Sequence, residues 1–182
     1  VEDSTLGPQS GTLTTGGTSS GTDKGIFSYV PFQLRRSNVY GANVPVGFET
    51  ERNETTGIVI EDNWLHDIWS SADDHTDIIN GNFHASHVVV KHNYLDGIRV
   101  GNSYVTNGIG IYDDPTSGPQ GIIEDWVIDN NYFDRSATMI LSTGSTSRFL
   151  NPFVLTNNVF TNRYTVKQVI TRTPSSQSGN KD

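Results

Sequence analysis

Short apolar runs recur along the chain within one repeated phrase. The phrase is an apolar run, two polar residues, an Asn or Ser, any residue, and a large apolar residue. Clear copies cover residues 58–65, 88–95, 126–133 and 153–160, and weaker copies cover residues 32–39 and 1–6. Consecutive copies place their Asn or Ser 26 to 38 residues apart, at Ser4, Ser37, Asn63, Asn93, Asn131 and Asn158. A repeat of that length indicates stacked structural units.

Within each phrase, alternation predicts which side chains are buried. On a strand, Val88 and Val90 would point inward, and Val89 and Lys91 outward. Stacking then predicts an inner column of Leu34, Ile60, Val90, Ile128 and Leu155, and a second of Leu6, Val39, Leu65, Leu95, Phe133 and Phe160. The Asn residues between the columns should bond to one another from unit to unit, and an Asn also tolerates the left-handed conformation of a tight turn. Ser4 and Ser37 should interrupt that row.

A further short strand is expected after each phrase, in residues 46–49, 75–80, 108–112, 138–142 and 166–170. Two or three short strands per unit predict an all-β fold, a right-handed parallel β-helix of about five coils. We expect it to occupy residues 32–170. Residues 1–31 would form an irregular coil with a Gly/Ser/Thr-rich loop, and residues 171–182 a polar tail that frays.

Composition and charge narrow the choice of partners. The net charge of −8 argues against nucleic acid, which needs a Lys and Arg footprint. The sequence contains no Cys, so it can form no disulfide and no thiolate metal site. It also has no apolar run that would suggest a membrane partner. The chain begins at Val1, inside a phrase and without Met, so we expect it to be a piece of a longer protein.

The phrase with Asn63, Asn93, Asn131 and Asn158 resembles the right-handed parallel β-helix superfamily of pectate lyases, polygalacturonases and alginate epimerases, over roughly residues 32–170. Residues 63–68, 74–77 and 88–93 are similar to β-helix segments in tail proteins of phages that infect actinobacteria. The chain also resembles secreted β-helix proteins. The resemblance implies a virion tail or an extracellular location, a polysaccharide or host-surface glycan as partner, and assembly as a homotrimer or a larger virion structure. The fold hosts enzymes and adhesins alike, so whether this chain is an enzyme stays open.

Candidate catalytic residues cluster around the five histidines, which all fall between residues 66 and 92. His75 and Asp77 in one groove could perform acid–base chemistry on a sugar ring. The resemblance to alginate epimerases implies an Asp-Pro-His-type motif, which Asp73-Asp74-His75 matches only in part. The resemblance to pectate lyases implies a basic residue as the base, here Arg99. The alternative is that His75 and Asp77 are turn residues that satisfy backbone groups.

Two pairs of acidic residues, Asp73 with Asp74 and Asp113 with Asp114, could hold Ca²⁺, which prefers oxygen ligands. The alternative is a pair of solvated acidic turns. Histidines 84, 87 and 92 do not have zinc spacing on one helical face.

Aromatic residues suggest a different kind of site. Trp64, Tyr94 and Tyr132 each follow a phrase Asn and should point outward in a row, and Tyr112 is a further candidate. Exposed aromatic rings could bind a glycan, or they could pack beneath loops. The sequence therefore supports two hypotheses. One is a structural and recognition module of a phage tail or surface appendage that presents a surface to host glycans. The other is a lyase or epimerase that acts on uronate-containing polysaccharides.

Overall fold

The fold is given by a computed structural model of the chain. It describes residues 1–7, 24–50, 57–68, 76–83, 85–97, 105–112, 123–143, 153–161, 163, 167–170 and 176–181. These residues form strands and turns, and none of them belongs to a helix. Accordingly, no helix in this part of the chain could span a membrane.

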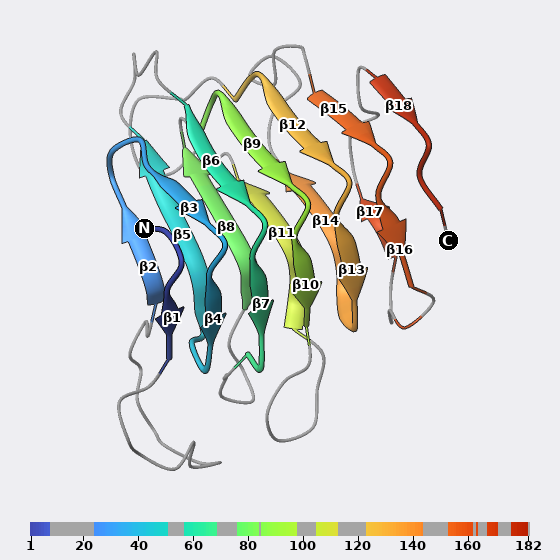
Figure 1. Ribbon diagram of the computed structural model, residues 1–182. Coiled ribbons are helices and arrows are strands. Elements are labelled where there is room, and N and C mark those ends of the chain that lie inside the picture. The colour runs from blue at the N-terminus through green and yellow to red at the C-terminus, as the bar shows by residue number, and fades with distance from the viewer. Residues whose placement is uncertain are drawn as a thin grey trace.

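The strands form three sheets, each of which runs from the N-terminal to the C-terminal part of the described chain (Figure 1). Sheet A contains β3 (Gln33–Arg35), β6 (Ile58–Glu61), β9 (Val88–Lys91), β12 (Trp126–Asp129), β15 (Phe153–Thr156) and β18 (Ser176–Ser178). Sheet B contains β1 (Thr5–Leu6), β4 (Asn38–Tyr40), β7 (Trp64–His66), β10 (Tyr94–Asp96), β13 (Tyr132–Asp134) and β16 (Val159–Phe160). Sheet C contains β2 (Lys24–Ser28), β5 (Val44–Thr50), β8 (Asp77–Phe83), β11 (Val105–Tyr112), β14 (Ser136–Thr143) and β17 (Lys167–Ile170).

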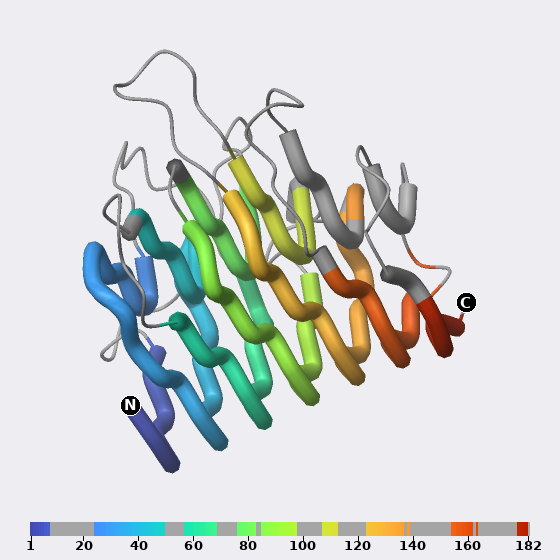
Figure 2. The backbone as a smooth tube through the Cα atoms, turned by 90° about the horizontal axis from the view of Figure 1, so that it is seen from above, coloured from blue at the N-terminus to red at the C-terminus, as the bar shows by residue number. Residues whose placement is uncertain are grey.

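The order of strands explains how the sheets are connected. Consecutive strands lie in different sheets, and every third strand returns to the same sheet beside its predecessor. All the pairings between these strands are parallel. The chain thus advances in one direction from its first strand to its last (Figure 2). The predicted all-β parallel fold is confirmed, and the arrangement is consistent with a parallel β-helix.

Both predicted inner columns are present. In sheet A, Leu34 pairs in register with Ile60, Ile60 with Val90, and the column continues through Ile128 to Leu155. In sheet B, Leu6, Val39, Leu65, Leu95, Phe133 and Phe160 are aligned in the same way. Apart from Leu6, which is half-buried, these side chains are buried in one apolar core. Alternation along each strand therefore directs one apolar stripe per sheet toward the interior.

The predicted Asn row lies where the chain passes from sheet A to sheet B. From Asn93 onward, each amide oxygen accepts two bonds from the previous Asn, as when Asn93 Oδ1 accepts from Asn63 N at 3.0 Å and from Asn63 Nδ2 at 2.9 Å. The same pair of bonds links Asn93 to Asn131 and Asn131 to Asn158. The amide nitrogens also donate to strand carbonyls, for example Asn93 Nδ2 to Ile60 O at 2.9 Å. These buried amides satisfy backbone groups that the turn leaves without a sheet partner.

The row Asn residues do not themselves adopt the left-handed conformation that an Asn tolerates in a tight turn. That conformation belongs to the residue before each of them, with φ of 60° at Asp62, 55° at His92, 53° at Asn130 and 55° at Asn157. The row Asn must direct its amide into the interior, so the exposed residue beside it makes the bend. Asp and Asn accept this conformation at low cost because their short side chains bond locally.

The two ends of the row differ from the sequence prediction in different ways. Ser37 N–H donates to Asn63 Oδ1 at 2.9 Å, and Ser4 N–H donates to Ser37 Oγ at 3.3 Å, so the serines continue the row without an amide donor. At the other end, residues 176–181 pair with the preceding coil. Strand β18 pairs with β15, and Asn180 Oδ1 accepts from Asn158 N at 2.9 Å. The polar tail assigned to residues 171–182 therefore extends the fold wherever it is described.

Candidate functional site

Three aromatic side chains form a row on the outer face of sheet B. Trp64, Tyr94 and Tyr132 are the first residues of β7, β10 and β13, and they pair in register. They are 45%, 36% and 41% exposed, because the residue after each of them points into the core. The predicted outward position of the three rings is confirmed. We call these three residues the aromatic row.

The rings of the aromatic row follow one another closely. The ring centroids of Trp64 and Tyr94 are 6.5 Å apart, with the planes 4° from parallel. The centroids of Tyr94 and Tyr132 are 5.2 Å apart, and those two rings meet edge to face at 77°. Such a strip offers apolar faces beside phenol hydroxyls, the combination that suits the C–H faces and hydroxyls of a sugar.

His66 fixes the position of Trp64. The two rings stack with centroids 3.7 Å apart and planes 17° apart, and Tyr40 stacks on the same imidazole at 5.5 Å. His66 Nδ1 is 2.8 Å from Asp67 Oδ2, and Nε2 is 2.7 Å from Asn38 Oδ1. One face of the indole is thus covered by a ring that two hydrogen bonds hold in place. Sequence analysis missed this role, although the spacing of two residues from Trp64 on a strand would have placed His66 on the same face.

Buried carboxylates lie beside the aromatic row. Asp96 and Asp134, at the ends of β10 and β13, are 5% and 0% exposed. Arg135 Nε donates to Asp96 Oδ1 at 2.7 Å, and Arg163 Nε donates to Asp134 Oδ1 at 2.8 Å. Each guanidinium also contacts the second carboxylate oxygen through Nη2. Two acids near the row are therefore neutralised by the protein's own arginines.

Tyr94 connects the row to these acids, since its hydroxyl donates to Asp134 Oδ2 at 3.4 Å. Burial raises the pKa of Tyr94, and the negative charges of Asp96 and Asp134 raise it further. The Tyr94 hydroxyl consequently remains protonated at neutral pH and can donate as well as accept hydrogen bonds.

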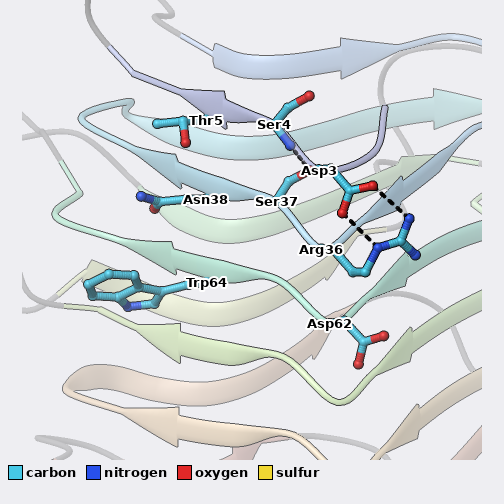
Figure 3. Close-up of a pocket in the computed structure, with 8 residues that line it drawn as sticks. All are labelled: Asp3, Ser4, Thr5, Arg36, Ser37, Asn38, Asp62 and Trp64. Carbon is cyan, nitrogen blue, oxygen red and sulfur yellow. Dashed lines mark hydrogen bonds and ion pairs between the residues drawn. The ribbon is translucent and has the colours of Figure 1, made fainter.

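A shallow hollow of about 490 Å³ lies at the Trp64 end of the row (Figure 3). Figure 3 shows Thr5, Asn38 and Trp64 aligned on neighbouring strands, with Asp3, Arg36 and Asp62 aligned at the preceding turns. Arg36 does not offer a free cation there. Its Nε and Nη2 donate to the two oxygens of Asp3 at 2.7 Å and 2.9 Å, and Nη2 also reaches Glu2 Oε2 at 3.0 Å.

A second polar cluster lies on sheet C, around Asp77. This carboxylate is 2% exposed and accepts hydrogen bonds from Asn80 Nδ2 at 2.5 Å, Asn107 Nδ2 at 2.6 Å and the Tyr112 hydroxyl at 3.2 Å. Burial, followed by the charge of Asp77, raises the pKa of Tyr112 far above its usual value. Tyr112 belongs to β11 of sheet C, so it lies apart from the aromatic row on sheet B. Asn107 was not a sequence candidate, because a lone Asn carries no signal of its own.

Several candidate residues lie outside the described part of the chain. They are His75, Arg99, Asp73, Asp74, Asp113 and Asp114. The catalytic set of His75, Asp77 and Arg99 and the Ca²⁺ site thus remain predictions. Among the described residues, no three His, Asp or Glu side chains are grouped closely enough to hold a metal ion. The three described histidines contact aspartates instead: His66 with Asp67, His87 with Asp125 at 2.9 Å, and His92 with Asp62.

Comparisons with known proteins identify no relative. No family model, no curated protein and no solved structure matches this chain. Its function must therefore be inferred from the side chains themselves.

Proposed function

We propose that this chain is a recognition module, a right-handed parallel β-helix of the pectate lyase-like type whose sheet B face binds glycans. The observation that carries the proposal is the aromatic row, three rings in register and 36% to 45% exposed. Exposed aromatic rings in a continuous strip are costly in water and are typical of a binding surface. The parallel connections support the right-handed sense, because such connections are right-handed in almost all proteins.

The surroundings of the row favour a sugar over a protein partner. Hydrogen-bonding groups border the rings, including the Tyr94 hydroxyl, the Asp62 carboxylate and the Asn38 amide. Sugars present apolar C–H faces between hydroxyl groups, so they need both kinds of contact. The core of a protein interface is depleted in charged residues, unlike this face.

The setting that we propose is a virion tail or another extracellular appendage, where the face would meet glycans of a host surface. The resemblance of the repeated phrase to phage tail β-helices supports this setting. Assembly as a homotrimer is part of the same proposal.

Binding can be tested by affinity electrophoresis in gels that contain neutral glucans, uronate polymers or actinobacterial cell-wall glycans. We expect at least one polymer to retard the protein. Tyr94→Ala should weaken retardation about tenfold, because it removes the central ring. Tyr29→Ala is the matched control, since Tyr29 is 61% exposed and lies outside the row. A protein that no polymer retards, or a Tyr94→Ala variant that binds normally, contradicts the proposal.

A lyase or epimerase that acts on uronates is the second candidate. The observation that favours it is the hydrogen bond from the Tyr112 hydroxyl to Asp77, since a Tyr beside a carboxylate can transfer a proton. Asn107 Oδ1 in this cluster is buried and has no hydrogen-bond partner in the described structure, so one acceptor stays available. The burial of Asp77 counts against ready access by a polymer.

The same polymers distinguish the two candidates when unsaturated uronates, new reducing ends and the uronate composition of the polymer are measured. Cleavage or epimerisation that is lost in both Asp77→Asn and Tyr112→Phe would make this chain an enzyme. Binding without either reaction would leave the recognition module.

A further inference from the structure

The aromatic row has a direction. It contributes one ring from each of three neighbouring strands, and adjacent strands of a sheet lie about 4.8 Å apart. The row therefore runs across the strands, along the line on which the coils stack (Figure 2). A ligand that contacts all three rings must be extended along this line. Its repeat must match the distances of 6.5 Å and 5.2 Å between successive ring centroids, which are close to the length of one sugar in an extended glycan.

The acids around Trp64 limit the charge of that ligand. Asp62 and Asp67 flank β7, and their side chains are 39% and 48% exposed. Each carboxylate contacts a histidine through one oxygen, which leaves the other oxygen able to accept a hydroxyl. Uronate carboxylates placed beside Asp62 and Asp67 would be repelled.

The arginines of this face that the structure describes do not reverse that preference. Arg36, Arg135 and Arg163 each contact a carboxylate of the protein. Lys181 pairs with Val159, which in turn pairs with Tyr132. Lys181 therefore lies two positions beyond Tyr132, past the end of the aromatic row. The net charge of −8 adds a long-range repulsion of polyanions.

We infer that the ligand is an uncharged, extended polysaccharide chain that lies along the direction of coil stacking, with successive sugars on Trp64, Tyr94 and Tyr132. The inference rests on the proposed glycan recognition and adds the orientation, the minimum length and the charge class of the ligand. Three rings in line require at least a trisaccharide for full contact. The carboxylates of Asp62 and Asp67 select hydroxyl groups.

Isothermal titration calorimetry with oligosaccharides of one to six units tests this inference. The uncharged probes are cello-, malto-, manno- and N-acetylchito-oligosaccharides, and the anionic probes are oligogalacturonates and oligoalginates. We expect at least one uncharged series to gain about tenfold or more in affinity between one and three units. Each uronate series of equal length should bind at least about tenfold more weakly than that series.

The possible outcomes distinguish this inference from the proposed glycan recognition on which it rests. Binding in which a trisaccharide is no tighter than a monosaccharide, or in which uronates match the best uncharged series, overturns the inference and leaves glycan recognition standing. If no oligosaccharide series binds, both the inference and the proposed glycan recognition are contradicted. Tyr94→Ala should reduce the gain from chain length, whereas Tyr29→Ala should preserve it, and circular dichroism would check that both variants fold.

Discussion

At the scale of single residues, the Asn row contributes most to specifying the fold. Each amide satisfies buried backbone groups of the preceding coil, as Asn93 does for the N–H of Asn63 and the carbonyl of Ile60. No other side chain of similar size offers a donor and an acceptor in this arrangement. The bend itself is made by the preceding residue, so the two tasks of the turn are divided between adjacent positions.

We expect Asn93→Ala to lower the free energy of unfolding by about 3 kcal/mol or more. The substitution leaves a buried N–H and a buried carbonyl without partners, at about 1–3 kcal/mol each. Urea unfolding would measure the change. Gln33→Ala, at an exposed position of β3, should stay within about 0.5 kcal/mol of the parent. Equal effects of the two substitutions would mean that the row is not a source of stability.

Tyr112 should make stability depend on alkaline pH. Its pKa is raised in the folded chain by burial and by Asp77. Above about pH 10 the unfolded chain loses this proton and the folded chain keeps it, so stability falls by up to about 1.4 kcal/mol per pH unit. Below that pH both states are protonated and the contribution is fully present. In Tyr112→Phe, the decline measured by urea unfolding between about pH 10 and 11 should be shallower by that amount. An unchanged decline would show that the phenol is not held protonated.

At the scale of strands, alternation decides which residues carry stability. On β12, Ile128 is fully buried whereas its neighbour Val127 is only half-buried. We expect Ile128→Ala to cost about 2–5 kcal/mol and Val127→Ala less than about 1 kcal/mol in urea unfolding. Similar costs at the two positions would contradict the assignment of the inner face.

Alternation also explains what the sequence could and could not predict for the strands. The inner columns were predictable because each phrase carries large apolar residues at fixed positions, such as Ile128 and Phe133. Strand β18 was missed because its sequence, Ser-Gln-Ser, has no apolar residue, and its role depends on pairing with β15. Propensity alone cannot identify a strand that the neighbouring coil stabilises.

At the scale of the whole molecule, the sequence predicted the aromatic row of sheet B better than the polar cluster around Asp77 on sheet C. The aromatic row was predictable because each ring follows a row Asn, so stacking the phrases also stacks the rings. The contact of Asp77 with Tyr112 was not predictable from the sequence. These residues lie 35 positions apart in sheet C, where the phrase does not fix the register. The stacking of His66 on Trp64 was not predicted, because it depends on the side-chain conformations of both rings, which the repeated phrase does not determine.

The most direct test of the account is hydroxyl-radical footprinting with mass spectrometry, with and without a polysaccharide that retards the protein in gels. Trp64, Tyr94 and Tyr132 should be oxidised readily in the free protein and protected together when the polymer is bound. Tyr29, which is 61% exposed, should be oxidised at the same rate in both samples. Protection that spares the aromatic row, or that falls equally on Tyr29, would contradict the claim that sheet B carries the binding face.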